Sequence, residues 1–123
     1  MSLEAERYRN EYIFVLYNNE FRKIALSDIM WIEASRSYCN IHLVEGESGG
    51  TILLSTPLLK VYKCLPTEHF KRISRSVVIN LRYVNAIRGN SVVINSSQFL
   101  ISSSYRKIIF SSFAFIGTKK KLY

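Results

Sequence analysis

The 123-residue chain has few acidic residues in its second half, only two cysteines and no long hydrophobic run. No apolar stretch approaches the about 18–20 residues that cross a bilayer, which excludes a membrane-spanning helix. The first residues also lack the basic start and apolar stretch of a signal peptide. Two cysteines without a secretory signal are typical of free thiols in a reducing compartment, so we expect a cytoplasmic protein.

The sequence offers little material for catalysis or for binding a metal. Glu68 is the last carboxylate side chain, and the chain has neither a glycine-rich phosphate loop nor a nucleophile elbow. Cys39 and His42 have the spacing of zinc ligands, but the alternating residues around them predict a strand that places them on opposite faces. Cys64 and His69 lie on either side of a predicted helix end. We therefore expect neither an enzyme nor a bound cofactor or metal.

Charge is distributed unevenly along the chain. Residues 1–59 hold 5 basic and 8 acidic side chains, a net charge of −3, whereas residues 60–123 hold 12 basic and 1 acidic, a net charge of +11. Such segregation in a folded domain favours an anionic partner: nucleic acid, a membrane surface or an acidic protein. Charge that serves solubility alone is the alternative. No strongly amphipathic basic helix supports a membrane surface.

Short apolar runs separated by polar residues predict one mainly β domain. Residues 29–32 are apolar on both faces, as in a central strand, and residues 38–44 alternate, with Cys39, Ile41 and Leu43 on one face. Two-residue turns are predicted at Asn18-Asn19, Gly89-Asn90 and Asn95-Ser96, and a glycine turn at residues 46–50. The remaining predicted strands are residues 12–17, 20–26, 51–55, 70–73, 77–80, 83–87, 91–94 and 98–101.

Two short helices are predicted. The first has Thr56 as its N-cap and Pro57 in its first turn, followed by an apolar stripe with two lysines outside it. Its stripe comprises Leu58, Val61, Tyr62 and Leu65, and the lysines are Lys60 and Lys63. The second begins at Ser104, although a strand is the alternative there. Its predicted inward residues are Tyr105, Ile108, Ile109 and Phe113.

Basic side chains gather with short hydroxyls at three interruptions between the predicted elements. Arginine and lysine supply charge for phosphate, hydroxyls supply directional hydrogen bonds, and an exposed arginine can read a guanine edge. Each segment alone is typical of a polar loop, but the three together favour a nucleic-acid surface. The candidate nucleic-acid-binding residues are Arg36, Ser37 and Tyr38, then Arg72, Ser74, Arg75 and Ser76, and finally Ser102, Ser104, Tyr105, Arg106 and Lys107.

Several motifs resemble those of LytTR DNA-binding domains. Residues 26–34, LSDIMWIEA, followed by YCNIH at residues 38–42, are similar to the opening motif of that family. Residues 70–80, FKRISRSVVIN, are similar to its middle motif. Residues 89–91 and the sequence ISSSYRK at residues 101–107 match its later hairpin and its ending. The resemblance runs from about residue 12 to residue 113.

This resemblance implies an elongated, mainly β fold of about ten strands in small sheets with two short helices. It further implies the output domain of a bacterial two-component response regulator, which regulates transcription by binding double-stranded DNA sequence-specifically. Loops enter successive grooves in that family, and they correspond here to residues 36–38, 72–76 and 102–107. A receiver domain in the full-length protein and dimers on paired repeats are also implied.

Two departures from the family pattern bear on base recognition. Ser74 stands where the family motif has histidine, and Ser103 stands where arginine is frequent. We expect Arg75 to read a base edge, and residues 36–38 to meet a neighbouring groove. Phosphates should be held by Ser76, Ser102, Ser104, Arg106 and Lys107. A module that binds RNA, single strands or any nucleic acid without specificity is the alternative.

The expected domain comprises residues 11–116. Residues 1–10 are interpreted as a tail or linker, or a cloning remnant, and residues 117–123 as a basic C-terminal tail.

Overall fold

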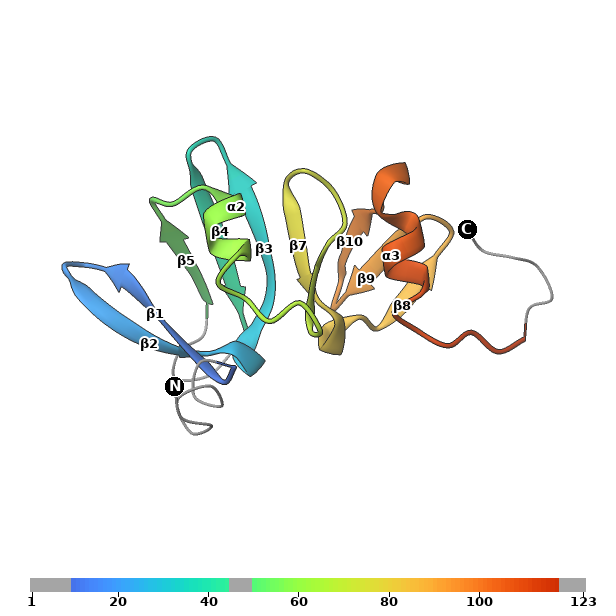
Figure 1. Ribbon diagram of the computed structural model, residues 1–123, viewed down its shortest axis with the longest axis horizontal. Helices are drawn as coiled ribbons and strands as arrows, with labels where there is room; N and C mark the ends of the chain where they lie inside the picture. The colour runs from blue at the N-terminus through green and yellow to red at the C-terminus, as the bar shows by residue number, and fades with distance from the viewer. Residues whose placement is uncertain (1–9, 45–49, 118–123) are drawn as a thin grey trace.

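The computed structural model describes residues 10–44 and 50–117, which form an elongated, mainly β fold (Figure 1). Ten strands in the described ranges build three antiparallel sheets, with orders β5-β4-β3-β7-β6, β1-β2 and β10-β9-β8. The prediction of about ten strands in small sheets is confirmed. The strands are β1 Tyr12–Tyr17, β2 Glu20–Ala25, β3 Ile29–Ser35, β4 Tyr38–Leu43, β5 Gly50–Leu54, β6 Phe70–Arg72, β7 Val77–Asn80, β8 Ala86–Arg88, β9 Ser91–Ile94 and β10 Ser97–Leu100.

Helical structure in the described residues is short, as expected. Helix α2 spans Leu58–Tyr62 and helix α3 spans Arg106–Phe110. Three 3₁₀ turns connect other elements: η1 Leu26–Asp28, η2 Leu81–Tyr83 and η3 Ser103–Tyr105. None of the helices among these residues is long and apolar enough to cross a bilayer.

Four hairpins close through two-residue loops whose first residue has a positive φ angle. Such loops match the twist of antiparallel strands and favour glycine or asparagine at that position. Asn18, Gly89 and Asn95 meet this preference, with φ of 51°, 61° and 55°. Arg36 does not, yet it has φ of 60° in the loop between β3 and β4.

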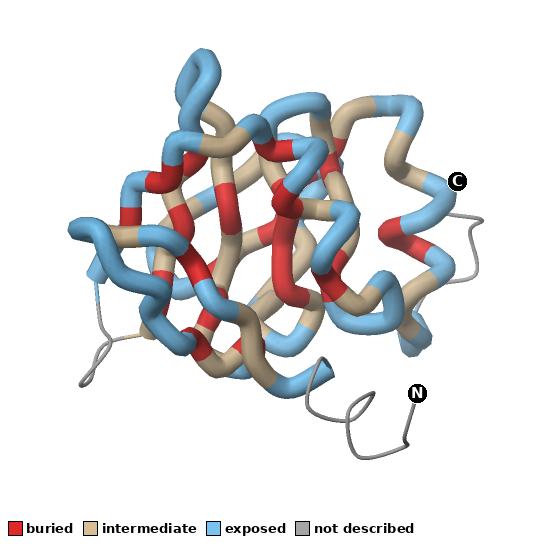
Figure 2. The backbone as a smooth tube through the Cα atoms, turned by 60° about the vertical axis from the view of Figure 1, so that its left-hand side comes forward, coloured by how far each residue is buried: buried red, intermediate tan, exposed pale blue. Residues whose placement is uncertain are grey.

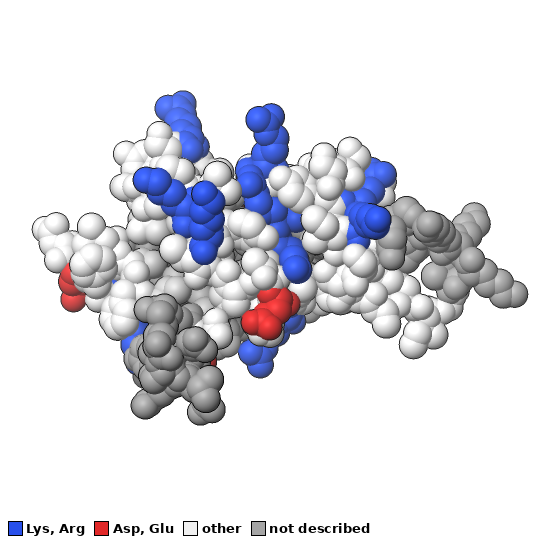
Figure 3. Space-filling view, viewed as in Figure 1, with Lys and Arg blue, Asp and Glu red and all other residues white. Residues whose placement is uncertain are grey.

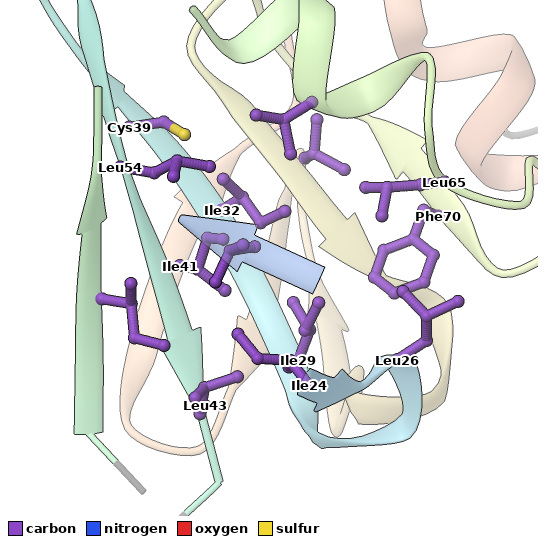
Figure 4. Close-up of a cluster of buried hydrophobic side chains, with 14 of the residues drawn as sticks. Ile24, Leu26, Ile29, Ile32, Cys39, Ile41, Leu43, Leu54, Leu65 and Phe70 are labelled. Atoms are coloured by element: carbon purple, nitrogen blue, oxygen red, sulfur yellow. The ribbon is translucent and has the colours of Figure 1, made fainter. Parts of the chain in front are cut away.

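The five-stranded sheet has a hydrophobic core on each face. One face packs against the β1-β2 hairpin and α2, and Figure 4 shows Ile32, Cys39, Ile41 and Leu54 among its buried side chains. On the other face, β3 and β7 contribute to a second core with β8–β10 and α3. The buried residues lie along the strands, whereas the hairpin tips are exposed (Figure 2).

Trp31 lies at the junction of the five-stranded and three-stranded sheets. Its ring stacks on His42, with centroids 4.3 Å apart, and contacts Phe99 of β10 at 5.1 Å. The carboxylate of Glu33 lies 2.7 Å from Nε2 of His42 on the neighbouring strand. His42 lies on the same face of the sheet as Trp31, whereas Cys39 lies in the core on the opposite face. Cys39 and His42 therefore cannot bind the same zinc ion.

Three predictions of local structure are wrong. Thr56 does not cap α2, because Pro57 occupies the N-cap position and makes no side-chain capping bond. The strand expected at residues 83–87 is replaced by η2 and the later strand β8, since the Asn80 side chain accepts a hydrogen bond from the Arg82 N–H and turns the chain. Ile108 is 48% exposed, because the 3₁₀ turn delays α3 to Arg106 and brings Phe110 inward instead.

Parts of the predicted organisation lie outside the described residues. These are the glycine turn at residues 46–49, most of the N-terminal tail at 1–9 and most of the basic tail at 118–123. The boundaries of the domain at residues 11 and 116 therefore stay predictions.

Candidate nucleic-acid interface

Antiparallel pairing brings the three basic segments to one side of the molecule. Strand β3 pairs with both β4 and β7, so the β3–β4 loop and the loop before β7 lie at the same end of the sheet. The start of α3 lies beside them along the upper side of Figure 1. We call residues 36–38, 72–76 and 102–107 together the contact edge.

Two backbone hydrogen bonds hold the three segments, or the residues next to them, against one another. The Ala34 N–H donates to the Ser76 carbonyl at 2.8 Å, which fixes the β3–β4 hairpin against the β6–β7 loop. The Ser102 N–H donates to the Ile73 carbonyl, also at 2.8 Å, which fixes the third segment against that loop. These two hydrogen bonds make the contact edge one connected surface.

The β3–β4 hairpin presents its tip to solvent. Arg36 and Ser37 are exposed, and Tyr38 is 44% exposed on the face opposite to the first core. Cys39 follows directly and is fully buried, so the tip projects from an anchored base. Burial also raises the pKa of the Cys39 thiol to about 11, which keeps it neutral.

The β6–β7 loop is braced from within. Nη2 of Arg72 donates to the Arg75 carbonyl at 2.7 Å, and the Ser76 N–H donates to Oγ of Ser74 at 3.2 Å. Ile73 is fully buried and holds the loop to the second core. The side chain of Arg75 stays exposed at the tip. Arg72 thus has a structural contact that its sequence position did not reveal.

The third segment runs along η3 into α3. Ser104 and Lys107 are exposed, whereas Ser102, Tyr105 and Arg106 are half-buried. Ile101 and Ile109 are fully buried on either side of the segment and anchor it to the second core. The Nε atom of Arg106 is buried without a hydrogen-bond partner among the described residues.

The contact edge is positively charged without local compensation. Its three segments contain five basic side chains and no carboxylate. Figure 3 shows lysine and arginine along the upper side of the molecule, over the β3–β4 tip, α2, the β6–β7 loop and α3, while acidic atoms lie lower. An uncompensated row of cations on connected loops suits a polyanion.

Two hollows lie away from the contact edge, near the start of β3. One, of about 320 Å³, is lined by residues such as Ser27, His69 and Arg82; the other, of about 450 Å³, is lined by Met30 and Val44 among others. Neither includes a residue of the contact edge. Within residues 10–44 and 50–117, no three potential metal-ligating side chains come together.

A family model matches most of the sequence. The sequence model described as the LytTr DNA-binding domain matches residues 19–113, most of the chain. The chain belongs to the LytTR family of DNA-binding domains. All three segments of the contact edge lie inside the matched range. No curated protein matches this LytTR domain.

A solved structure shares the fold of this LytTR domain. It is the LytTr DNA-binding domain of a Bacillus cereus protein described as a methyl-accepting/DNA response regulator. The TM-score is 0.69 at 18% sequence identity, over 85% of this chain and 98% of the other. This likeness shows the fold, and a mainly β fold with small sheets is the one expected from the sequence.

The two departures from the LytTR motifs differ in their surroundings. Ser74 is half-buried, and its hydroxyl bonds within the β6–β7 loop, so the shorter side chain takes part in bracing. Ser103 is exposed as the first residue of η3.

Proposed function

We propose that this LytTR domain binds double-stranded DNA sequence-specifically, with the contact edge reaching into successive grooves. In this proposal it is the output domain of a bacterial transcriptional response regulator that acts in the cytoplasm, with a receiver domain in the full-length protein. The observation that carries the proposal is the joining of three exposed basic segments into one surface by backbone hydrogen bonds. We expect no catalytic activity.

A duplex suits the contact edge better than a single strand does. Modules that bind single strands stack bases on exposed aromatic side chains. The three segments contain two aromatic residues, Tyr38 and Tyr105, and Tyr105 packs against the second core. One exposed tyrosine offers little stacking surface, whereas loops with cations and hydroxyls match phosphates that border a groove.

We assign base reading to Arg75 and phosphate contacts to most other residues. Arg75 is exposed at the tip of a loop whose backbone is held by Arg72, and a positioned guanidinium can bond two acceptors of guanine. Arg36, Ser37 and Tyr38 meet the neighbouring groove. Ser76, Ser102, Ser104, Arg106 and Lys107 hold phosphates, and paired repeats in the DNA bring two domains together.

Replacing Arg75 by alanine tests the assignment. Loss of a bidentate base contact costs about 1–3 kcal/mol, so affinity for the cognate duplex should fall about 5–150-fold while affinity for a random duplex changes little. Fluorescence anisotropy at one fixed salt concentration measures both. Equal losses on the two duplexes would make Arg75 a phosphate contact.

The alternative nucleic-acid partners are tested with the unmodified protein. Duplex DNA, single-stranded DNA and RNA of one sequence are titrated at the same salt concentration. The proposal expects the duplex to bind tightest. Tighter binding of either single strand would replace it with the single-strand or RNA module.

A further inference from the structure

Helix α2 and its C-cap residue carry two lysines that none of the three segments includes. Lys60 and Lys63 are both exposed, whereas Leu58 and Val61 of the same helix are buried in the first core. Residues three apart are neighbours on a helix surface, so the two cations form one exposed basic face.

This basic face has no acidic partner in the described structure. Across residues 10–44 and 50–117, the ion pair that forms joins His42 and Glu33, on the opposite face of the sheet. Like charges on neighbouring helical positions repel each other. An anion bound over α2 would relieve the repulsion between the two lysines. A face exposed only to solvent keeps this repulsion.

The fold places α2 beside the contact edge. Leu54, the last residue of β5, pairs with Cys39 next to the β3–β4 tip, and α2 begins four residues later. Figure 1 shows α2 against the upper half of β3 and β4, and Figure 3 shows its basic side chains beside those of the β3–β4 tip and the β6–β7 loop. The basic side chains of α2 and of the contact edge therefore lie on the same side of the molecule.

We infer that Lys60 and Lys63 form a fourth contact segment, which binds a phosphate strand of the same duplex. The inference rests on the proposed function and deepens it. A loop in a groove has a phosphate strand on each side, and α2 flanks the β3–β4 and β6–β7 loops on one side. The contacts carry charge without base recognition, so they add affinity for any duplex.

The salt dependence of duplex binding tests this segment. Each phosphate contact contributes about 0.9 to the slope of log affinity against log salt concentration. The K60A/K63A variant should therefore lose close to two units of slope. Between about 50 and 200 mM salt, the affinity of the wild type should fall roughly tenfold further than that of the variant. Cognate and random duplexes should show the same difference.

Two further variants serve as controls. R22A/R82A removes the same charge away from the contact edge, because Arg22 lies on β2 and Arg82 follows the far end of β7. K60R/K63R keeps the charge of α2 and should keep the wild-type slope. Thermal unfolding of each variant checks that it is folded.

The outcomes separate the inference from the function on which it rests. If the wild type binds duplexes and K60A/K63A has the slope of R22A/R82A, the fourth segment is refuted and the proposed function stands. If the wild type binds no duplex, both are refuted. A slope lost in K60A/K63A and retained in K60R/K63R supports the fourth segment.

Discussion

Replacing Arg36 with glycine should stabilise the fold while weakening DNA binding. Arg36 is the first residue of the β3–β4 loop and has φ of 60°. The equivalent positions of the other two-residue hairpin loops described here hold asparagine or glycine, at Asn18, Gly89 and Asn95. A residue with a long side chain at a strained position is often retained for function rather than for stability.

The expected magnitudes follow from the backbone. A left-handed conformation costs an ordinary residue about 1–2 kcal/mol, while glycine adds about 0.4–1 kcal/mol of entropy to the unfolded chain. The net stabilisation is then up to about 1.5 kcal/mol, or up to about 6 °C in Tm for a domain of this size. Losing the exposed guanidinium should cost about tenfold in affinity for duplex DNA.

Calorimetry and anisotropy together check this prediction. Asn18→Gly is the matched control, because asparagine already tolerates its φ of 51°, and its Tm should move less. Arg36→Asn should recover part of the stability gain without recovering DNA binding. A lower Tm for Arg36→Gly would refute the reasoning from strain, and unchanged affinity would remove Arg36 from the contact edge.

Two further predictions concern Arg72 and the cysteines. Arg72→Lys keeps the charge but loses the planar donor that holds the Arg75 carbonyl. Affinity for the cognate duplex should therefore fall by about 1 kcal/mol with an unchanged salt slope. Unchanged affinity for the cognate duplex would show that this bond does not position Arg75. Because the pKa of Cys39 is raised to about 11 in the folded state, its stabilising contribution is complete below pH 9 and declines as the pH rises toward 11. Iodoacetamide at pH 8 should modify the exposed Cys64 rapidly and Cys39 only upon unfolding; equal rates in the native protein would contradict the burial of Cys39.

The local sequence pattern was sufficient to predict the inward side chains of strands that have one buried face. The alternation of residues 38–43 correctly predicted Cys39, Ile41 and Leu43 on the core face. The Asn18-Asn19 turn followed from the tolerance of asparagine for positive φ. The region after β7 could not be predicted this way, because the Asn80 side chain that turns the chain is itself held by the Ile29 carbonyl, 51 positions away.

For the candidate site, too, some features could be predicted from the sequence and others depend on the fold. Charge, hydroxyls and motifs were sufficient to select residues 36–38, 72–76 and 102–107 as candidates, and their contacts with DNA stay predictions. The bonds from Ala34 to Ser76 and from Ser102 to Ile73 depend on tertiary arrangement. So does the position of α2, whose lysines are separated in sequence from every segment of the contact edge. Spacing along the sequence alone could not predict that these lysines lie beside the contact edge.

Selection from a random duplex library with the unmodified protein, at stated salt concentration, tests the central claim most directly. A domain whose connected loops read successive grooves should enrich one sequence motif, with two spaced half-sites if two domains bind together. Retention of duplexes without any enriched motif would contradict sequence-specific recognition and leave only binding through charge.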